Sequence, residues 1–160
     1  MPMVKIGRFL ASLFVGFFFV SSTCLASDTH TIEEVQALAE KAHALVVEKG
    51  IEGAKPALHD KSGEFWSADQ ELYAFVIDYD GNWVIYPPKP AGEGKNLLNV
   101  KDADGKELVR EMITLSKTEG SGWTEYRWMN PATQKIQKKK TFVKAVDGQP
   151  YFVAVGLYLD

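Results

Sequence analysis

Five short stretches of β-branched and aromatic residues limit the fold more narrowly than any other feature of this chain. They span residues 72–77, 83–86, 122–129, 136–144 and 151–159. Turn residues separate them, as at Asp80-Gly81, Asn130-Pro131 and Asp147-Gly148. Such segments between Gly, Pro, Asn and Asp predict β-strands, and Asp80-Gly81 between the first two predicts a hairpin.

Helical patterns precede and interrupt these strands. Residues 31–49 carry apolar side chains at spacings of three and four, with Thr31 and Glu34 forming a capping box and Gly50 at the expected end. A short helix fits residues 54–58, and a second helical pattern runs from Leu108 to Gly120. The simplest arrangement is an α+β domain, an antiparallel sheet of five to six strands with the long N-terminal helix packed on it.

The first residues have the pattern of a signal peptide. Lys5 and Arg8 precede an uncharged apolar run at residues 9–20, which is shorter than the roughly 20 residues that span a bilayer. We expect cleavage after Ala26, so that residues 1–26 are a signal peptide and residues 27–160 form one periplasmic or secreted domain. Two alternatives stay open: acylation of Cys24, as in a lipoprotein, and retention of the segment as an uncleaved anchor.

Composition excludes some classes of partner. Cys24 is the single cysteine, so an exported domain beyond residue 26 is held together by its core and not by disulfides. The formal net charge is −3, and loss of Lys5 and Arg8 makes it more negative. A mildly acidic protein repels polyanions, so we expect no nucleic-acid partner.

Five segments resemble, in the same order, those of the single Cache domains, the extracytoplasmic sensor parts of many bacterial chemoreceptors and histidine kinases. They are the hairpin IDYDGNWVIYP at 77–87, the loop GKNL at 94–97 with KDADG at 101–105, GSGWTEY at 120–126, KKTFVK at 139–144 and GLY at 156–158. The resemblance covers most of the chain beyond residue 26.

This resemblance implies a PAS-like sheet with a pocket on one face for a small organic acid, and no catalysis. Family members usually continue into a transmembrane helix and a signalling module, whereas this chain ends at Asp160. We therefore expect a stand-alone exported binder that presents its ligand to a membrane-bound signalling or transport partner, as in chemotaxis and other signal transduction.

Candidate ligand-binding residues follow from the family match and from strand alternation. Lys139 stands at the family's lysine position, and a carboxylate needs a fixed cation and converging donors to replace lost water. Alternation places Thr141 on the same face as Lys139 and turns the flanking lysines the other way. We expect hydroxyl donors and aromatic walls from Tyr126, Tyr86, Tyr73, Phe75, Trp123 and Trp128.

Plainer interpretations exist for the same residues. Aromatic side chains at a period of two are typical of an ordinary sheet core, and the run Lys138-Lys139-Lys140 is typical of a solvated edge that discourages strand pairing. Arg127 is an alternative cation on the face opposite Tyr126. If the aromatic residues are only core and the lysines only a solvated edge, the pocket is filled by the protein's own side chains. The alternative function is then an exported protein–protein interaction module.

An enzymatic or metal-dependent function has little support in the sequence. His30, His43 and His59 do not have the spacing of metal ligands, and no cysteine follows residue 26. The segments at 78–81 and 102–105 lack the terminal Glu of a calcium loop and are typical of turns. We expect neither catalysis nor a cofactor.

The long first helix offers a surface for a homodimer.

Overall fold

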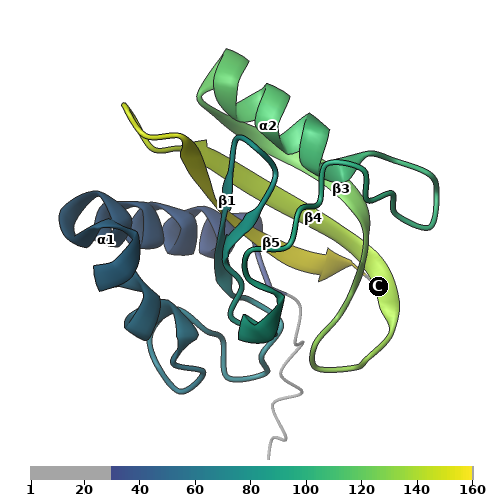
Figure 1. The fold of residues 1–160 in the computed structure, drawn as a ribbon. Coiled ribbons are helices and arrows are strands. Elements are labelled where there is room, and N and C mark those ends of the chain that lie inside the picture. The colour runs from purple at the N-terminus through teal and green to yellow at the C-terminus, as the bar shows by residue number, and fades with distance from the viewer. Residues whose placement is uncertain (1–29, 160) are drawn as a thin grey trace, which may run out of the picture.

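Five antiparallel strands form one sheet in the order β2-β1-β5-β4-β3 (Figure 1). The structure is a computed structural model, and it describes residues 30–159. The elements are α1 (Ile32–His59), β1 (Ala74–Asp78), β2 (Trp83–Ile85), the 3-10 turn η1 (Pro90–Gly92), α2 (Leu108–Glu119), β3 (Ser121–Met129), β4 (Ile136–Ala145) and β5 (Tyr151–Leu159).

The last strand joins two hairpins into this sheet. β5 pairs with β1 on one side and with β4 on the other, so β2 and β3 are the two edges. The α+β fold with a five-stranded antiparallel sheet is therefore confirmed, and the strand bounds agree with the predicted ones to within two residues.

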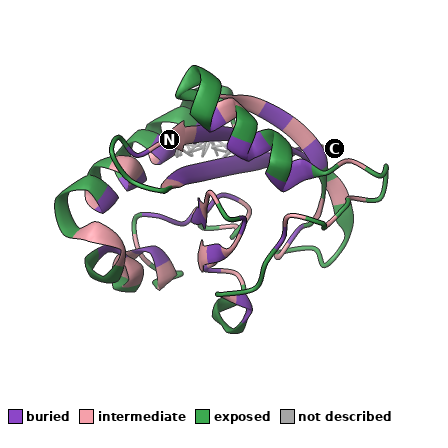
Figure 2. Cartoon of the chain, turned by 45° about the horizontal axis from the view of Figure 1, so that its top comes forward, coloured by how far each residue is buried: buried purple, intermediate pink, exposed green. Residues whose placement is uncertain are grey.

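The two helices cover opposite faces of the sheet (Figure 1). α1 packs on the face formed by Ala74, Val76, Phe142 and Val155 and their neighbours. On the other face, α2 buries Val109 and Met112 against the side chains of a second cluster. Strands are largely buried between the helices, whereas the outward sides of the helices are exposed (Figure 2).

α1 begins as predicted and is kinked where the sequence predicts an end. The Thr31 hydroxyl accepts a hydrogen bond from Glu34 N at 3.1 Å, and the Glu34 carboxylate accepts one from Thr31 N at 2.9 Å. Gly50 has a φ of +67°, which glycine adopts at little cost. Helical structure resumes after it and includes the predicted segment at 54–58, so the two predicted helices are one kinked element.

The Asp80-Gly81 hairpin is confirmed and brings the following loop onto the sheet. Gly81 has a φ of +85°, and a Cβ there would lie 2.5 Å from Leu98 Cγ. Gly81 O accepts a hydrogen bond from Leu97 N at 2.8 Å, and Trp83 N donates to Lys95 O at 3.0 Å. A side chain at this turn would push the loop away, so glycine fixes both the turn and the loop.

The predicted signal peptide at residues 1–26 lies outside the described residues and stays a prediction. Among residues 30–159, no helix has both the length and the apolar character required to cross a bilayer.

Candidate ligand-binding site

Lys139 is fully buried, although it lies in a run of three lysines. It occupies the middle of β4, and strand alternation turns Lys138 and Lys140 to the opposite face. There Lys138 Nζ lies 2.6 Å from the Glu125 carboxylate, and Lys140 Nζ lies 5.4 Å from the centre of the Trp123 ring. The run therefore consists of one interior lysine between two surface ones, as alternation predicts.

Neutral groups surround the Lys139 amine. Its Nζ donates hydrogen bonds to the hydroxyl oxygens of Tyr73, at 2.8 Å, and of Tyr158, at 3.3 Å. It also lies 4.0 Å from the ring centre of Tyr73, 4.4 Å from that of Tyr158 and 5.7 Å from that of Phe75. Ring faces attract a cation, so these side chains form an aromatic cage around the amine.

Further hydrogen bonds connect these tyrosine hydroxyls to the end of β3. Tyr158 Oη donates to Met129 O at 2.8 Å. The two tyrosine oxygens lie 3.2 Å apart, and because a hydroxyl has a single proton, Tyr73 is the donor of this pair. The chain thus runs from Lys139 through Tyr73 and Tyr158 to the backbone of Met129.

A second hydroxyl pair lies next to Lys139. The Tyr126 and Thr141 side-chain oxygens are 2.9 Å apart, and both residues are buried. Gly156 of β5 leaves room for this arrangement, because a Cβ there would lie 2.7 Å from Lys139 Cε and would overlap Thr141 Oγ1. We call Lys139, Tyr73, Phe75, Tyr126, Thr141 and Tyr158 the Lys139 cluster.

Three aromatic side chains, here called the aromatic roof, cover this face of the sheet. The rings of Trp83 and Tyr86 stack with their centres 4.0 Å apart, and Trp128 meets Trp83 edge-on at 6.3 Å. Trp128 Nε1 donates a hydrogen bond to Tyr86 Oη at 3.3 Å. Trp83 also contacts Phe75 edge-on at 5.3 Å, and Trp128 contacts Tyr126 at 6.3 Å, so the roof packs on the cluster.

Burial determines the protonation of the cluster. It holds the pKa of the Lys139 ammonium well below its usual range, and Glu71 acts weakly in the opposite direction. Burial also raises the pKa of the Tyr73, Tyr126 and Tyr158 hydroxyls, so they are protonated donors at neutral pH.

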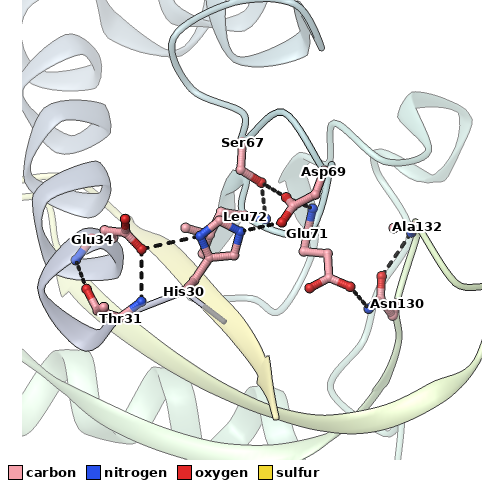
Figure 3. Close-up of polar contacts among 9 residues, drawn as sticks. All are labelled: His30, Thr31, Glu34, Ser67, Asp69, Glu71, Leu72, Asn130 and Ala132. Atoms are coloured by element: carbon pink, nitrogen blue, oxygen red, sulfur yellow. Dashed lines mark hydrogen bonds and ion pairs between the residues drawn. The ribbon is translucent and has the colours of Figure 1, made fainter. Parts of the chain in front are cut away.

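Polar contacts fix the segment that leads into Tyr73. His30 lies between two carboxylates, with Nε2 2.8 Å from Asp69 and Nδ1 3.3 Å from Glu34. Glu71 N donates to Asp69 at 3.1 Å, and Asn130 Nδ2 donates to Glu71 at 2.7 Å. Figure 3 shows this row of contacts from the start of α1 to the β3–β4 turn. The start of α1 is thereby tied to the residues beside the Lys139 cluster.

Surface hollows lie beside the cluster. Three hollows of 210 to 280 Å³ in the described part of the chain are lined by residues other than Lys139. Trp128 lines the one of 210 Å³, together with Met129 and Ile136. Trp128 thus lines this hollow and also contacts Tyr126 of the Lys139 cluster.

Seven of the eight predicted site residues lie together on the face covered by α2. They are Lys139, Thr141, Tyr73, Phe75, Tyr126, Tyr86 and Trp128. The prediction that Trp123 forms a wall with them is wrong in its placement. Trp123 packs on Phe142 on the α1 face, with ring centres 5.2 Å apart, because its position in β3 differs by an odd number from those of Tyr126 and Trp128.

The alternative cation, Arg127, points away from the cluster. Its guanidinium Nε lies 2.9 Å from the Asp104 carboxylate, and its side chain is exposed. Two aromatic residues of the site were missed by sequence reasoning, Trp83 and Tyr158. The signal for Tyr158 was present, because it shares the alternation of Gly156 in β5 and ends a motif already noted.

The acidic loops have the turn roles expected from the sequence. Asp78 Oδ1 accepts a hydrogen bond from Asn82 N at 2.8 Å, and Asp102 Oδ1 accepts one from Lys106 N at 2.8 Å. Within residues 30–159, no three His, Cys, Asp or Glu side chains lie close enough together to hold a metal ion.

Comparisons with known proteins agree with the observed fold. The sequence profile of Single Cache domain 2 matches residues 25–160. The sensor histidine kinase MctS of Rhizobium johnstonii is 39% identical over 88 residues, which are 55% of this chain and 19% of MctS. The methyl-accepting chemotaxis protein McpP of Pseudomonas putida is 23% identical over 92 residues, or 58% of this chain and 17% of McpP. The matches thus span less than a fifth of either relative.

Solved structures share the fold. A periplasmic sensor domain of a chemotaxis protein aligns with a TM-score of 0.71 and 28% identity, over 80% of this chain and 94% of that domain. A Cache chemosensory domain whose carboxylic acid recognition has been described aligns with a TM-score of 0.70 and 21% identity, over 80% and 92% of the two chains. At that identity the second likeness speaks for the fold alone.

Proposed function

The chain belongs to the Single Cache domain 2 family, and on that premise we propose that it is an exported sensor domain that binds a small carboxylate at the Lys139 cluster. The carboxylate replaces the Tyr73 and Tyr158 hydroxyls as the hydrogen-bond acceptor of the Lys139 amine. The aromatic roof then covers the bound ligand.

One observation carries this proposal: a fully buried lysine whose amine is hydrogen-bonded to neutral groups. A lysine buried without a carboxylate partner lowers the stability of a fold, and an apolar side chain of similar size would pack at less cost. A bound carboxylate supplies the missing charge, and the Tyr73, Tyr126 and Tyr158 hydroxyls supply further donors. Lys139 is thus poor as a packing residue and well suited to hold an anion.

The surroundings of Lys139 favour a small ligand. Phe75, Trp83 and Trp128 offer apolar ring surfaces, and the cluster has little room unless the roof moves. A short organic acid with few carbon atoms fits such a site better than a long or highly charged one. The carboxylic acid recognition described for a Cache chemosensory domain of the same fold is consistent with this ligand class.

Signalling requires a partner that distinguishes the bound from the free conformation. The relatives are a histidine kinase and a chemotaxis receptor, so a membrane-bound signalling or transport protein outside the cytoplasm is the proposed partner. The contact between His30 and Asp69 ties the start of α1 to the segment before Tyr73. Through this contact, a movement of Tyr73 on ligand binding can change the position of the start of α1.

A thermal-shift screen tests the proposal. The purified protein is heated with acetate, lactate, pyruvate, succinate, alanine or adenine. A hundredfold excess over Kd stabilises the fold by about 2.7 kcal/mol, which raises the melting temperature by several degrees. We expect a saturable rise with one or more of the acids, its loss in Lys139→Met, and its retention in the control Lys138→Met, whose side chain is on the opposite face. A rise that survives Lys139→Met refutes the site.

A second function is favoured by one feature of the same cluster. Within residues 30–159, every buried side-chain nitrogen and oxygen has a hydrogen-bond partner, so the cluster is satisfied by its own side chains. An interaction module with a self-filled pocket has this property. A flat response to all six compounds favours this module over the sensor.

A further inference from the structure

We propose that Lys139 is a neutral amine in the ligand-free protein and takes up one proton when a carboxylate binds. This inference rests on the function proposed above and adds to it that the ligand is bound together with a proton.

The hydrogen-bond acceptors around the Lys139 amine are as many as the N–H groups of its neutral form. The Lys139 nitrogen has two hydrogen-bond partners among the described residues, the oxygens of Tyr73 and Tyr158. A neutral amine has two N–H groups, and each finds one acceptor. A charged ammonium has three, and the third would be buried without an acceptor in a fully enclosed position. The geometry therefore matches the neutral form.

Within residues 30–159, the titratable groups that face the amine leave an ammonium without a close negative charge. Four tyrosines face this side of the sheet: Tyr73 just before β1, Tyr86 just after β2, Tyr126 on β3 and Tyr158 on β5. Burial raises the pKa of each hydroxyl, so none supplies a negative charge. Glu71 is the acidic group that favours a charged Lys139, but none of its oxygens lies within 4.0 Å of Nζ, and it accepts a hydrogen bond from Asn130.

The ring faces of Tyr73 and Tyr158 attract an ammonium, and this attraction opposes the proposal. It is smaller than the cost of removing an unpaired ammonium from water. Burial accordingly keeps the pKa of Lys139 well below its ordinary value.

Binding of the carboxylate then transfers one proton from the solvent to Lys139. Near neutral pH a small carboxylic acid is an anion in solution, and the solvent supplies the proton that joins the lone pair of Lys139 Nζ. The new ammonium pairs with the carboxylate, and no covalent bond of the ligand changes. By linkage, the Kd rises about tenfold per pH unit between the pKa of Lys139 in the free protein and its higher pKa in the complex.

The protonation state of the free protein is measured directly. In protein labelled with ¹³C at lysine Cε, the Lys139 signal is assigned by its absence from Lys139→Met. We expect the chemical shift of a neutral amine at pH 7, moving to that of an ammonium as acetate, lactate or pyruvate saturates the site. An ammonium shift in the ligand-free protein at pH 7 overturns the proposal whatever the protein binds.

Proton uptake is measured by calorimetry of the same three acids in phosphate and in Tris. These buffers differ in ionisation enthalpy, so an uptake of one proton per ligand makes the apparent binding enthalpy depend on the buffer with a slope of one. Binding with a slope of zero overturns the coupling and leaves the carboxylate sensor standing. No binding of these three acids or of succinate, at a folded protein with a neutral Lys139, overturns the proposed function and the coupling with it.

Discussion

The indole of Trp128 donates a hydrogen bond to the Tyr86 hydroxyl at 3.3 Å, although the two residues belong to opposite edges of the sheet. Tyr86 directly follows β2, and Trp128 lies near the end of β3. Their contact therefore bridges the three inner strands, and Lys139 lies on the middle part of the face beneath it. We expect this contact to cover a ligand bound at Lys139.

Replacing Tyr86 by Phe tests whether the bridge retains the ligand. Phe keeps the stack on Trp83 but leaves the Trp128 N–H without its acceptor, at a cost of about 1 kcal/mol. We expect a severalfold faster dissociation of the bound acid in stopped-flow displacement, with a smaller change in the association rate. Tyr79→Phe is the matched control, because Tyr79 stacks on Phe152 elsewhere in the same apolar cluster. Equal dissociation rates in Tyr86→Phe and the unaltered protein contradict a retaining role.

The family resemblance singled out Lys139. Alternation along strands then placed Lys139 and Thr141 on one face and turned Lys138 and Lys140 away, as the structure shows. The same rule excludes Trp123, so its inclusion was an error in applying the rule and not a failure of the rule.

Other features depend on arrangements that no local pattern contains. The bridge between Tyr86 and Trp128 joins residues at opposite edges of the sheet, which are 42 positions apart in the sequence. The hydroxyl chain to Met129 O depends on the register of β5 between β1 and β4, which pairs Lys139 with Tyr158. Register between strands distant in sequence is set by packing, so the segment of Tyr158 indicates the face on which its side chain lies but not its contact with Lys139.

Gly156 is predicted to be required for the position of Lys139. Adding a methyl group there forces Lys139 Cε and Thr141 to move, and overpacking of this kind costs about 1–3 kcal/mol. We expect Gly156→Ala to lower the urea midpoint and to abolish acid binding even at temperatures where the fold is intact. Gly92→Ala is the control, since a Cβ there would make an ordinary contact of 3.5 Å with Tyr86. Unchanged affinity in folded Gly156→Ala refutes the positioning role.

Lys139→Met is predicted to stabilise the protein while it destroys the site. An apolar side chain of similar length removes a buried amine, and such replacements are often neutral or stabilising by about 1–4 kcal/mol. The gain depends on pH, because the folded-state pKa of Lys139 lies below its ordinary value of 10.5. Between these two pKa values Lys139 is protonated in the unfolded chain but not in the folded protein, so the free energy of unfolding of the unaltered protein rises with pH. The stability advantage of Lys139→Met over the unaltered protein therefore shrinks by up to about 1.4 kcal/mol per pH unit. Urea unfolding at pH 7, 8 and 9 measures this difference, and an advantage that grows with pH contradicts a neutral Lys139.

Glu93 is predicted to hold the loop that carries Tyr86. Its Oε1 accepts hydrogen bonds from His59 Nε2 at 2.6 Å and from Tyr86 N at 2.8 Å, and Lys55 Nζ lies 3.5 Å from its other oxygen. Burial raises the pKa of this carboxyl, but the bonds from Tyr86 and His59 and the charge of Lys55 outweigh it, so the pKa lies below 4.5. A carboxyl with a lowered pKa contributes stability above its unfolded value and loses it as the pH falls through the folded one.

We therefore expect Glu93→Gln to lower the free energy of unfolding by about 1–2 kcal/mol at pH 7, where the charged hydrogen bonds are lost. This difference should shrink as the pH falls from 4.5 through the lowered pKa of the folded protein, because the unfolded chain binds the proton first and the folded carboxyl then loses its charge as well. Urea unfolding at pH 7 and at pH 3 to 4 measures it. The control is Glu52→Gln, which also removes a carboxylate near Lys55 but from a side chain that is 89% exposed. A Glu93→Gln deficit that is equal at both pH values shows that the amide disturbs the loop by its shape, since loss of the negative charge predicts convergence at low pH.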